Sequence, residues 1–415
     1  MAVVGSGVAG LTTAWLLAPH HDVTMFERSD YAGGHTHTVT ISDGPDAGTP
    51  VDTGFIVMNH RNYPLFSRLL ERLGVALQDS DMSFSYACER TGFCWAGNGL
   101  DGLFAQRRNL VRPEFWGMLA GIAAFHRRAR RDLAEGAVGG RTLAEYARHA
   151  RVRADVLDRY LLPMGSAIWS APLGAIARFP AEVFLRFFDN HGLLSFGGQP
   201  TWRTVVGGSH TYVQRIVAAL PRGVRLREAV LGVRRRADRV DVRLADRTEG
   251  FDHVVLATHA DEAFALLDDP SPDERRLLGA WSYSRNHTVL HTDAGVLPPC
   301  RRAWSSWNYV REAAGGDDAP VSVTYHMNRL QRLRASREYC VTLNRRGGFA
   351  PGTVLAEFDY THPEYTFASL ATQSALRDLS GRARTWYCGS YFGWGFHEDA
   401  VRSGADVARG FGVAL

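Results

Sequence analysis

The sequence contains no lysine, so arginine supplies all 47 of the side chains counted as lysine or arginine. A lysine Schiff base, a lysine general base and a lysine-held water are therefore excluded from any mechanism. The formal net charge is only +4, and no run of basic residues interleaved with aromatic residues forms an obvious groove for a nucleic-acid strand, so nucleic-acid binding is not expected. With 45% hydrophobic and 22% charged residues, a disordered or fibrous chain is also excluded.

Cysteine is scarce, and no two cysteines form a C-x-x-C pair. The odd number and the spacing argue against a disulfide framework, a zinc site and a thiol redox motif, and they fit a reducing cytoplasm. No stretch reads as a signal peptide or reaches about 18 uninterrupted apolar residues. We therefore expect a cytoplasmic protein without a transmembrane helix, and the 415 residues predict two domains. The five cysteines are Cys88, Cys94, Cys300, Cys340 and Cys388.

The start of the chain carries a glycine-rich motif between two strand-like runs. Residues 2–4 precede Gly5-Ser6-Gly7-Val8-Ala9-Gly10, a helical stretch follows from Leu11, and a second strand over Asp22 to Phe26 ends at Glu27. This order matches the βαβ dinucleotide fingerprint, in which successive glycines make the tight turn, admit the pyrophosphate and allow close helix packing. The helix N-terminus would face the phosphates, and Glu27 would accept hydrogen bonds from an adenosine ribose.

A second glycine pair indicates which dinucleotide is bound. Gly33-Gly34 is followed by His35-Thr36-His37-Thr38 and later by Asp52-Thr53-Gly54-Phe55, which a nicotinamide-binding unit does not need. In these residues the sequence resembles the flavin amine oxidase and phytoene desaturase superfamily. The resemblance implies an α/β fold with a glutathione reductase-type FAD-binding Rossmann domain and an inserted mixed α+β substrate domain. The family usually has arginine after the pair, where this chain has His35.

Two later segments extend the resemblance to the C-terminus. Val230 stands where the family's backbone brackets adenine, and the strand Thr385 to Gly389 precedes a closing helix whose N-terminal amides face the flavin pyrimidine. Ser390 takes the place of an acid that often holds the ribityl chain. The resemblance implies these FAD-binding residues: Gly5, Gly7, Val8, Ala9, Gly10, Glu27, Arg28, Gly34, His35, Thr36, Gly54, Phe55, Ile56, Val230, Gly389, Ser390, Phe396 and His397.

The expected FAD domain comprises three separate stretches, 1–85, 203–280 and 381–415. The substrate domain comprises 86–202, expected to be mostly helical, and 281–380, which carries strand-like runs. Within the FAD domain, strands are expected in 224–244 and 252–258, and the closing helix is expected to pass through Ser403, Gly404, Ala408 and Phe411. The candidate helices of the substrate domain are Leu100 to Leu133, Thr142 to Ala150 and Asp155 to Tyr160, and its candidate strands are Asn286 to His291, Val321 to His326 and Cys340 to Leu343.

A flavin site needs a group to manage the substrate proton. Many amine oxidases of the superfamily hold a water with lysine, so the lack of lysine disfavours amine oxidation here. Histidine can serve as a base near neutral pH, although a candidate of this kind, taken singly, is more often a satisfied structural group. His35, His37 and Asp52 lack the further ligands of a metal site, so no metal is expected. The catalytic candidates are His397, Tyr391, Glu398, Tyr325 and His191, with His326 also considered.

Several phrases are similar to a narrower bacterial group, the FAD-dependent fatty-acid desaturases related to furan fatty acid formation. This resemblance implies desaturation of an unsaturated or methyl-branched fatty acyl chain, held in a phospholipid, with a lipid methyltransferase as partner. Spacing alone supports only an FAD oxidoreductase. An amine or isoprenoid oxidase, and a flavin-binding partner of a methyltransferase without turnover, stay open. The phrases are 52–57, 80–85, 325–331, 341–344 and 395–399.

One segment is consistent with a lipid substrate. From Phe104 to Arg131 the chain carries seven arginines and several aromatic residues, with Glu114 as its only acid. Such a segment can lie on the anionic headgroups of the inner membrane face, as a peripheral contact. The alternative is an ordinary solvated helix whose apolar side lies in the core.

Overall fold

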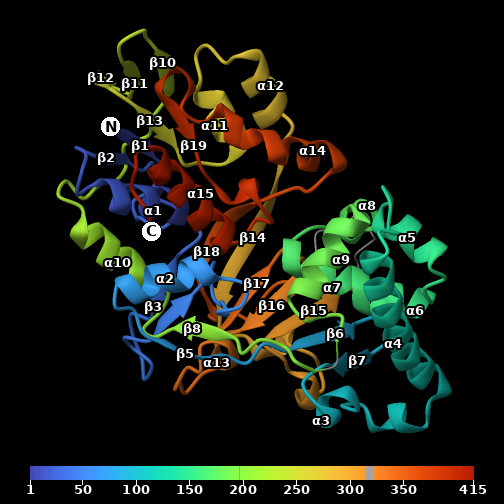
Figure 1. The fold of residues 1–415 in the computed structure, drawn as a ribbon. Coiled ribbons are helices and arrows are strands. Elements are labelled where there is room, and N and C mark those ends of the chain that lie inside the picture. The colour runs from blue at the N-terminus through green and yellow to red at the C-terminus, as the bar shows by residue number, and fades with distance from the viewer. Residues whose placement is uncertain (196, 314–321) are drawn as a thin grey trace.

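The structure is a computed structural model that describes residues 1–195, 197–313 and 322–415 (Figure 1). Its first sheet is parallel, with the strand order β19-β13-β1-β2-β9. Every residue of β1, β2 and β13 is buried, which explains their apolar-rich sequences. The predicted α/β fold is confirmed. The bounds are β1 Ala2–Val4, β2 Thr24–Phe26, β9 Val224–Arg225, β13 Val254–Leu256 and β19 Thr385–Tyr387.

Helices pack against this sheet and against each other. α1 (Val8–Leu17) lies beside α15 (His397–Gly410), and a Cβ added to Gly404 would lie 2.5 Å from the carbonyl oxygen of Ala9. The missing side chain therefore lets the two helices approach closely. α10 (His210–Ala219) contacts α1, and α2 (Pro64–Arg72) contacts α15. The closing helix is confirmed, except that Phe411 caps it rather than belonging to it.

A seven-stranded sheet lies beside the first, in the order β18-β14-β17-β16-β15-β6-β7. All neighbours pair antiparallel except β15 and β6. Because β6 and β7 join this sheet, the start of 86–202 is strand rather than helix; the assignment of ranges to two domains stays a prediction. The bounds are β6 Phe84–Cys88, β7 Phe93–Ala96, β14 Tyr283–His291, β15 Trp307–Arg311, β16 Ser322–His326, β17 Cys340–Leu343 and β18 Val354–Pro363.

The helices of the first insertion gather at the end of this sheet (Figure 1). The prediction of one helix from Leu100 to Leu133 is wrong, because Pro113 cannot continue a helix but can begin one. Asp155 to Tyr160 is helical as predicted, but it is part of a longer run that continues through a wider helical turn at Leu157–Leu161 into α7. The bounds are α3 Leu100–Leu103, α4 Pro113–Ala134, α5 Leu143–His149, α6 Ala154–Val156, α7 Leu162–Trp169, α8 Leu173–Arg178 and α9 Ala181–Asn190.

The other helices and strands expected from the sequence are largely present. The strand at Cys340 to Leu343 and the helix near Thr142 to Ala150 are confirmed, and the strand at Asn286 begins earlier, at Tyr283. Val321 lies outside the described residues. No described helix is long and apolar enough to cross a membrane. The other elements are β3 Thr38–Thr40, β4 Pro50–Asp52, β5 Leu77–Asp79, β8 Arg203–Val205, β10 Gly232–Arg235, β11 Val240–Arg243, β12 Thr248–Phe251, α11 Ala260–Leu266, α12 Pro272–Leu278, α13 Met327–Leu330 and α14 Phe367–Leu376.

Candidate cofactor site and active site

The first glycine turn has the geometry of a dinucleotide cradle. Gly5 has φ 98°, and a Cβ there would lie 2.7 Å from the carbonyl oxygen of Ala257. A Cβ on Gly10 would lie 2.1 Å from the carbonyl oxygen of Gly5, so both positions exclude a side chain. By contrast, nothing lies within 4 Å of a Cβ built on Gly7, the residue before Val8 and Ala9 at the start of α1. The backbone is therefore open where a diphosphate would approach.

Glu27 lies beside this turn at the end of β2. Its carboxylate accepts hydrogen bonds from the Ser6 hydroxyl at 2.6 Å and from the Ser6 and Ser29 amides. The backbone carbonyl of Glu27 accepts from the amide of Glu228, which brings the segment before Val230 alongside. Arg28 points elsewhere and forms an ion pair with Glu262 at 2.8 Å. The structure thus brings the segment before Val230 alongside Glu27, while Arg28 is ion-paired with a residue of α11.

The second glycine pair rests on the first turn. A Cβ on Gly34 would lie 3.2 Å from the Cα of Gly7, and Gly33 forms an isolated bridge with Gly7. Gly54 packs as closely, because a Cβ there would lie 2.1 Å from the carbonyl oxygen of His35. Phe55 and the buried Ile56 follow. Segments far apart in the sequence therefore form one glycine-lined region.

The N-terminus of α15 faces the same region. The His397 ring stacks on Phe55, with 3.6 Å between centroids, and its Nε2 lies 3.0 Å from the Thr36 hydroxyl and 3.1 Å from that of Tyr212. Burial lowers the pKa of His397 to about 3, so the ring is neutral. The first helical hydrogen bond runs from Ala400 to Phe396, so the preceding amides point out of the helix end. Gly389 and Ser390 form the turn that leads into this end.

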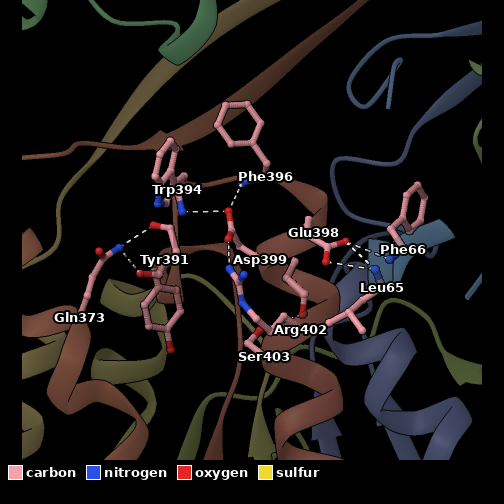
Figure 2. A network of polar contacts seen from close by, with 12 residues as sticks. Leu65, Phe66, Gln373, Tyr391, Trp394, Phe396, Glu398, Asp399, Arg402 and Ser403 are labelled. Atoms are coloured by element: carbon pink, nitrogen blue, oxygen red, sulfur yellow. Dashed lines mark hydrogen bonds and ion pairs between the residues drawn. The ribbon is translucent and has the colours of Figure 1, made fainter. Parts of the chain in front are cut away.

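Figure 2 shows that the two acids at the start of α15 are engaged with backbone amides. Glu398 accepts from Leu65 and Phe66 at the N-terminus of α2, at 3.0–3.1 Å. Asp399 accepts from the amides of Trp394 and Phe396 and pairs with Arg402. Burial raises the pKa of both carboxyls. Glu398 therefore caps the N-terminus of α2, whereas the sequence predicts a catalytic role for it.

The other catalytic candidates do not converge on one point. Tyr391 is buried, and its hydroxyl has no hydrogen-bond partner among the described residues; burial raises its pKa well above 10. Tyr325 packs edge-on against Trp307 in the seven-stranded sheet, and burial raises its pKa as well. His326 lies on the same strand and bonds Glu338. These side chains contact different neighbours from those of His397.

His191, in contrast, lies near His397 within a group of rings that we call the aromatic wall. His191 stacks on Phe187 at 3.9 Å, and Phe187 stacks on Phe396 at 5.0 Å, next to His397. The Nδ1 of His191 lies 2.9 Å from the carbonyl oxygen of Phe187, and burial lowers the pKa of this ring to about 4. The wall consists of Phe187, His191, Trp202, Trp394 and Phe396.

Sequence reasoning missed a cluster that we call the histidine junction, formed by His35, His259 and His362. Ring centroids lie 5.8 Å apart between His35 and His259 and 5.3 Å between His35 and His362. His35 follows the glycine pair, His259 follows β13, and His362 comes from β18 of the other sheet, so the junction joins the two sheets. Only the pairing of β18 brings His362 here, and no local pattern signals it.

The junction histidines are neutral. Burial, followed by the nearby His362 and His259, lowers the pKa of His35 well below 6.5, and burial lowers that of His362 to about 4. The Nε2 of His35 lies 3.0 Å from the carbonyl oxygen of Thr361. Because a carbonyl only accepts, Nε2 carries the proton and Nδ1 keeps a lone pair. Among the described residues no group of three or more histidine, cysteine, aspartate or glutamate side chains is placed to hold a metal.

Comparison with known families agrees with this geometry. Residues 8–292 match the family described as flavin containing amine oxidoreductase. The chain belongs to this family. As a flavin containing amine oxidoreductase it is an FAD-dependent enzyme, and the open Gly7, the crowded Gly5 and Gly10, and Glu27 at the end of β2 fit that cofactor. The role of each predicted residue toward FAD stays a prediction.

Solved structures show the same fold across nearly the whole chain. A fatty acid isomerase from P. acnes that produces CLA matches with TM-score 0.69 and 16% identity, covering 99% of this chain and 98% of that one. A redesigned putrescine oxidase gives 0.72 and 14%, covering 99% and 98%. Cyclohexylamine oxidase from Brevibacterium oxydans gives 0.69 and 15%, covering 99% and 97%. No curated protein matches the sequence.

Proposed function

We propose that this flavin containing amine oxidoreductase removes hydrogen from an unsaturated or methyl-branched fatty acyl chain, esterified in a phospholipid, to form a further double bond. One observation carries the proposal: both acids at the start of α15 are committed to amides or arginine, beside a wall of aromatic rings. His191 and His397 are held neutral by burial. These surroundings offer an uncharged chain an apolar contact surface, and they leave no free carboxylate at the start of α15 to pair with a substrate ammonium.

Two further points support an acyl substrate. The chain lacks the lysine that many amine oxidases use, so that route to an amine is closed. One protein of similar fold is named as a fatty acid isomerase. Two others are named as amine oxidases, and they support the alternative of an amine substrate. The proposed lipid substrate thus rests on the apolar, aromatic side chains of the wall and on the short segments that resemble the fatty-acid desaturases.

The reaction separates a hydride and a proton. Bound FAD supplies the hydride acceptor, and dioxygen serves as the final acceptor of the two electrons. The acyl chain loses a hydride from one carbon and a proton from the adjacent carbon; the electron pair of the first C–H bond leaves with the hydride, and the pair of the second forms the new C=C bond. We assign the proton to Nδ1 of His35, because the Thr361 carbonyl holds the other ring proton on Nε2. Burial keeps this base in its proton-accepting form.

Anaerobic reduction tests the function. FAD-loaded protein is mixed with phospholipid that carries unsaturated or methyl-branched chains, and the flavin absorbance is followed while mass spectrometry records the loss of two hydrogens. Bleaching by the lipid supports the proposal. Bleaching by putrescine or cyclohexylamine instead identifies an amine oxidase, and bleaching by an isoprenoid identifies an isoprenoid oxidase. No bleaching by any of them favours a flavin-binding partner of a lipid methyltransferase without its own turnover.

A further inference from the structure

Large apolar side chains are exposed together in the segment 100–116, at the end of the molecule that carries α3 (Figure 1). Val111 is 82% exposed, Leu100 76%, Trp116 50% and Leu110 47%. We call these four residues the apolar tip. They are four of the ten exposed large apolar side chains among the described residues, within one short segment. Scattered exposed apolar residues are ordinary, whereas a cluster of this kind marks an interaction site.

The tip differs from the amphipathic helix expected from the sequence. The apolar side of α4 is buried, with Phe115, Met118, Ile122 and Phe125 in the core, so the helix itself presents no free apolar face there. The exposed residues instead precede or begin α4, in α3 and in the 3₁₀ turn Arg107–Val111. Between Gly99 and Pro113 the segment is anchored by buried Gly102, Phe104 and Asn109, while Leu100, Leu110 and Val111 stay exposed.

Trp116 shows how the tip is prepared for an apolar partner. Its Nε1 donates a hydrogen bond to the carbonyl oxygen of Leu110 at 2.9 Å, and its ring packs on Phe104 at 5.4 Å. The indole N–H is therefore satisfied within the segment. The half-exposed ring can enter an apolar layer without leaving a polar group unpaired.

Arginines alternate with the apolar residues. Arg108 and Arg112 are exposed, and neither has a carboxylate within ion-pair distance in the described part of the chain. Arg107 pairs with Asp101, and Arg302, from the adjacent turn Arg301–Ala303, lies 3.9 Å from the same carboxylate. Arg108 donates to the Gln106 side chain at 3.3 Å, but no acid among the described residues neutralises either guanidinium, so both suit a partner that is apolar inside and anionic at its surface.

We propose that the apolar tip docks on the surface of an anionic phospholipid bilayer, with Leu100, Val111 and Trp116 entering the acyl layer. Arg108 and Arg112 bind lipid phosphates. A bilayer offers an apolar interior beneath a layer of negative charge, which matches exposed apolar residues and arginines that alternate within one short segment. The tip lies on the substrate part of the molecule, away from the parallel sheet and its glycine turns (Figure 1).

Vesicle sedimentation of the FAD-loaded protein tests the proposal. Vesicles of phosphatidylcholine with an equal part of phosphatidylglycerol are compared with phosphatidylcholine alone, at low and high salt. We expect binding to the anionic vesicles that weakens with salt. Val111→Asp should lower the partition coefficient at least tenfold, and Arg108→Gln and Arg112→Gln about fivefold each.

Matched controls separate docking from general effects. Leu355→Asp replaces a residue that is 41% exposed in β18, and Arg148→Gln replaces an exposed arginine of α5; both should leave binding unchanged. Equal flavin spectra and melting temperatures establish that each variant is folded. The assay needs no turnover, so its result is independent of the proposed reaction.

Three results would overturn the proposal. The first is wild-type protein that stays in the supernatant with anionic vesicles. The second is Leu355→Asp lowering binding as much as Val111→Asp does. The third is a change of oligomeric state in Val111→Asp, seen by analytical ultracentrifugation, without a change in vesicle binding; the partner would then be a second copy of this chain.

Discussion

Glu398, in the first turn of α15, accepts a hydrogen bond of 3.0 Å from the backbone amide of Phe66 in α2. The same carboxylate accepts from Leu65, so one side chain serves two of the amides that begin α2. Helix N-termini leave such amides without intrahelical partners, and a carboxylate there also meets the positive end of the helix dipole. Glu398 thereby ties α2 to the helix that faces the cofactor region.

Replacement of Glu398 should reduce stability. Glu398→Ala leaves buried amides without an acceptor, so we expect a loss of about 1–3 kcal/mol in the free energy of unfolding. Urea unfolding measures it. Glu114→Ala, at the exposed first turn of α4, is the matched control and should cost less than about 0.5 kcal/mol. A Glu398→Ala variant as stable as that control would contradict the assigned cap.

Two glycines of the first turn should respond differently to alanine. Gly10→Ala creates a backbone overlap and should destabilise the fold by about 1–3 kcal/mol. At Gly7, where φ is −63° and a Cβ meets nothing within 4 Å, alanine is compatible with the fold. We expect Gly7→Ala to keep its melting temperature without FAD but to lose at least tenfold in FAD affinity, measured by flavin fluorescence. Unchanged affinity would show that the diphosphate does not approach Gly7.

His35→Gln tests the proposed base. Glutamine can still donate to the Thr361 carbonyl but cannot take the substrate proton, so anaerobic flavin reduction should slow by about 100-fold or more. Because His35 is also an expected FAD-binding residue, the reduction rate is compared per bound flavin. His37→Gln is the matched control, because that ring stacks on Tyr31 outside the junction. Equal rates in the two variants would remove His35 from the mechanism.

The pH dependence of reduction gives a second check on His35. Its pKa is lowered well below 6.5, so the ring accepts protons throughout the neutral range and loses this ability only when the pH falls below the lowered pKa. The wild-type reduction rate should therefore stay constant as the pH falls through 6.5. Stopped-flow measurements of flavin reduction from pH 8 to pH 5 test this constancy. A rate that falls by half near pH 6.5 would identify a solvated histidine as the base instead.

Asp52 should make stability depend on pH. It is fully buried among neutral donors, with Ser209 and Thr38 bonding its carboxyl, and burial raises its pKa from 3.8 to about 6. The folded state then binds more protons than the unfolded state between these values, so stability falls as the pH rises through this window, by about 3 kcal/mol in total. Asp52→Asn should lack this slope. Unfolding at several pH values compares the two proteins, and parallel curves would contradict the assignment.

Local patterns were enough to predict the cofactor half of the molecule. A turn made of Gly5, Gly7 and Gly10 between two buried strands has few structural solutions, because Gly5 and Gly10 have no room for a Cβ and Gly7 leaves the backbone open to a diphosphate. The glycine pair follows the same rule, because a Cβ on Gly33 would lie 2.4 Å from the carbonyl oxygen of Thr36. Pro113 also signals a helix start by itself, because proline fits the first turn of a helix and not its interior, so the single helix expected from Leu100 to Leu133 is wrong for a local reason.

The substrate side depended on long-range pairing. Whether Glu398 faces a substrate or caps α2 depends on where α2 lies, more than 300 positions earlier in the chain. His362 reaches His35 only because β18 pairs with β14 and crosses toward the glycine pair.

The sequence by itself therefore determined the parallel α/β fold, the dinucleotide turn and the absence of lysine chemistry, since these depend on residue identity and short spacing. Only the tertiary structure decided which acids are already bonded, which histidines are buried and neutral, and which apolar residues of 100–116 stay exposed. Burial and hydrogen-bond partners come from contacts between distant segments, and those contacts set both the pKa values and the surfaces of this protein.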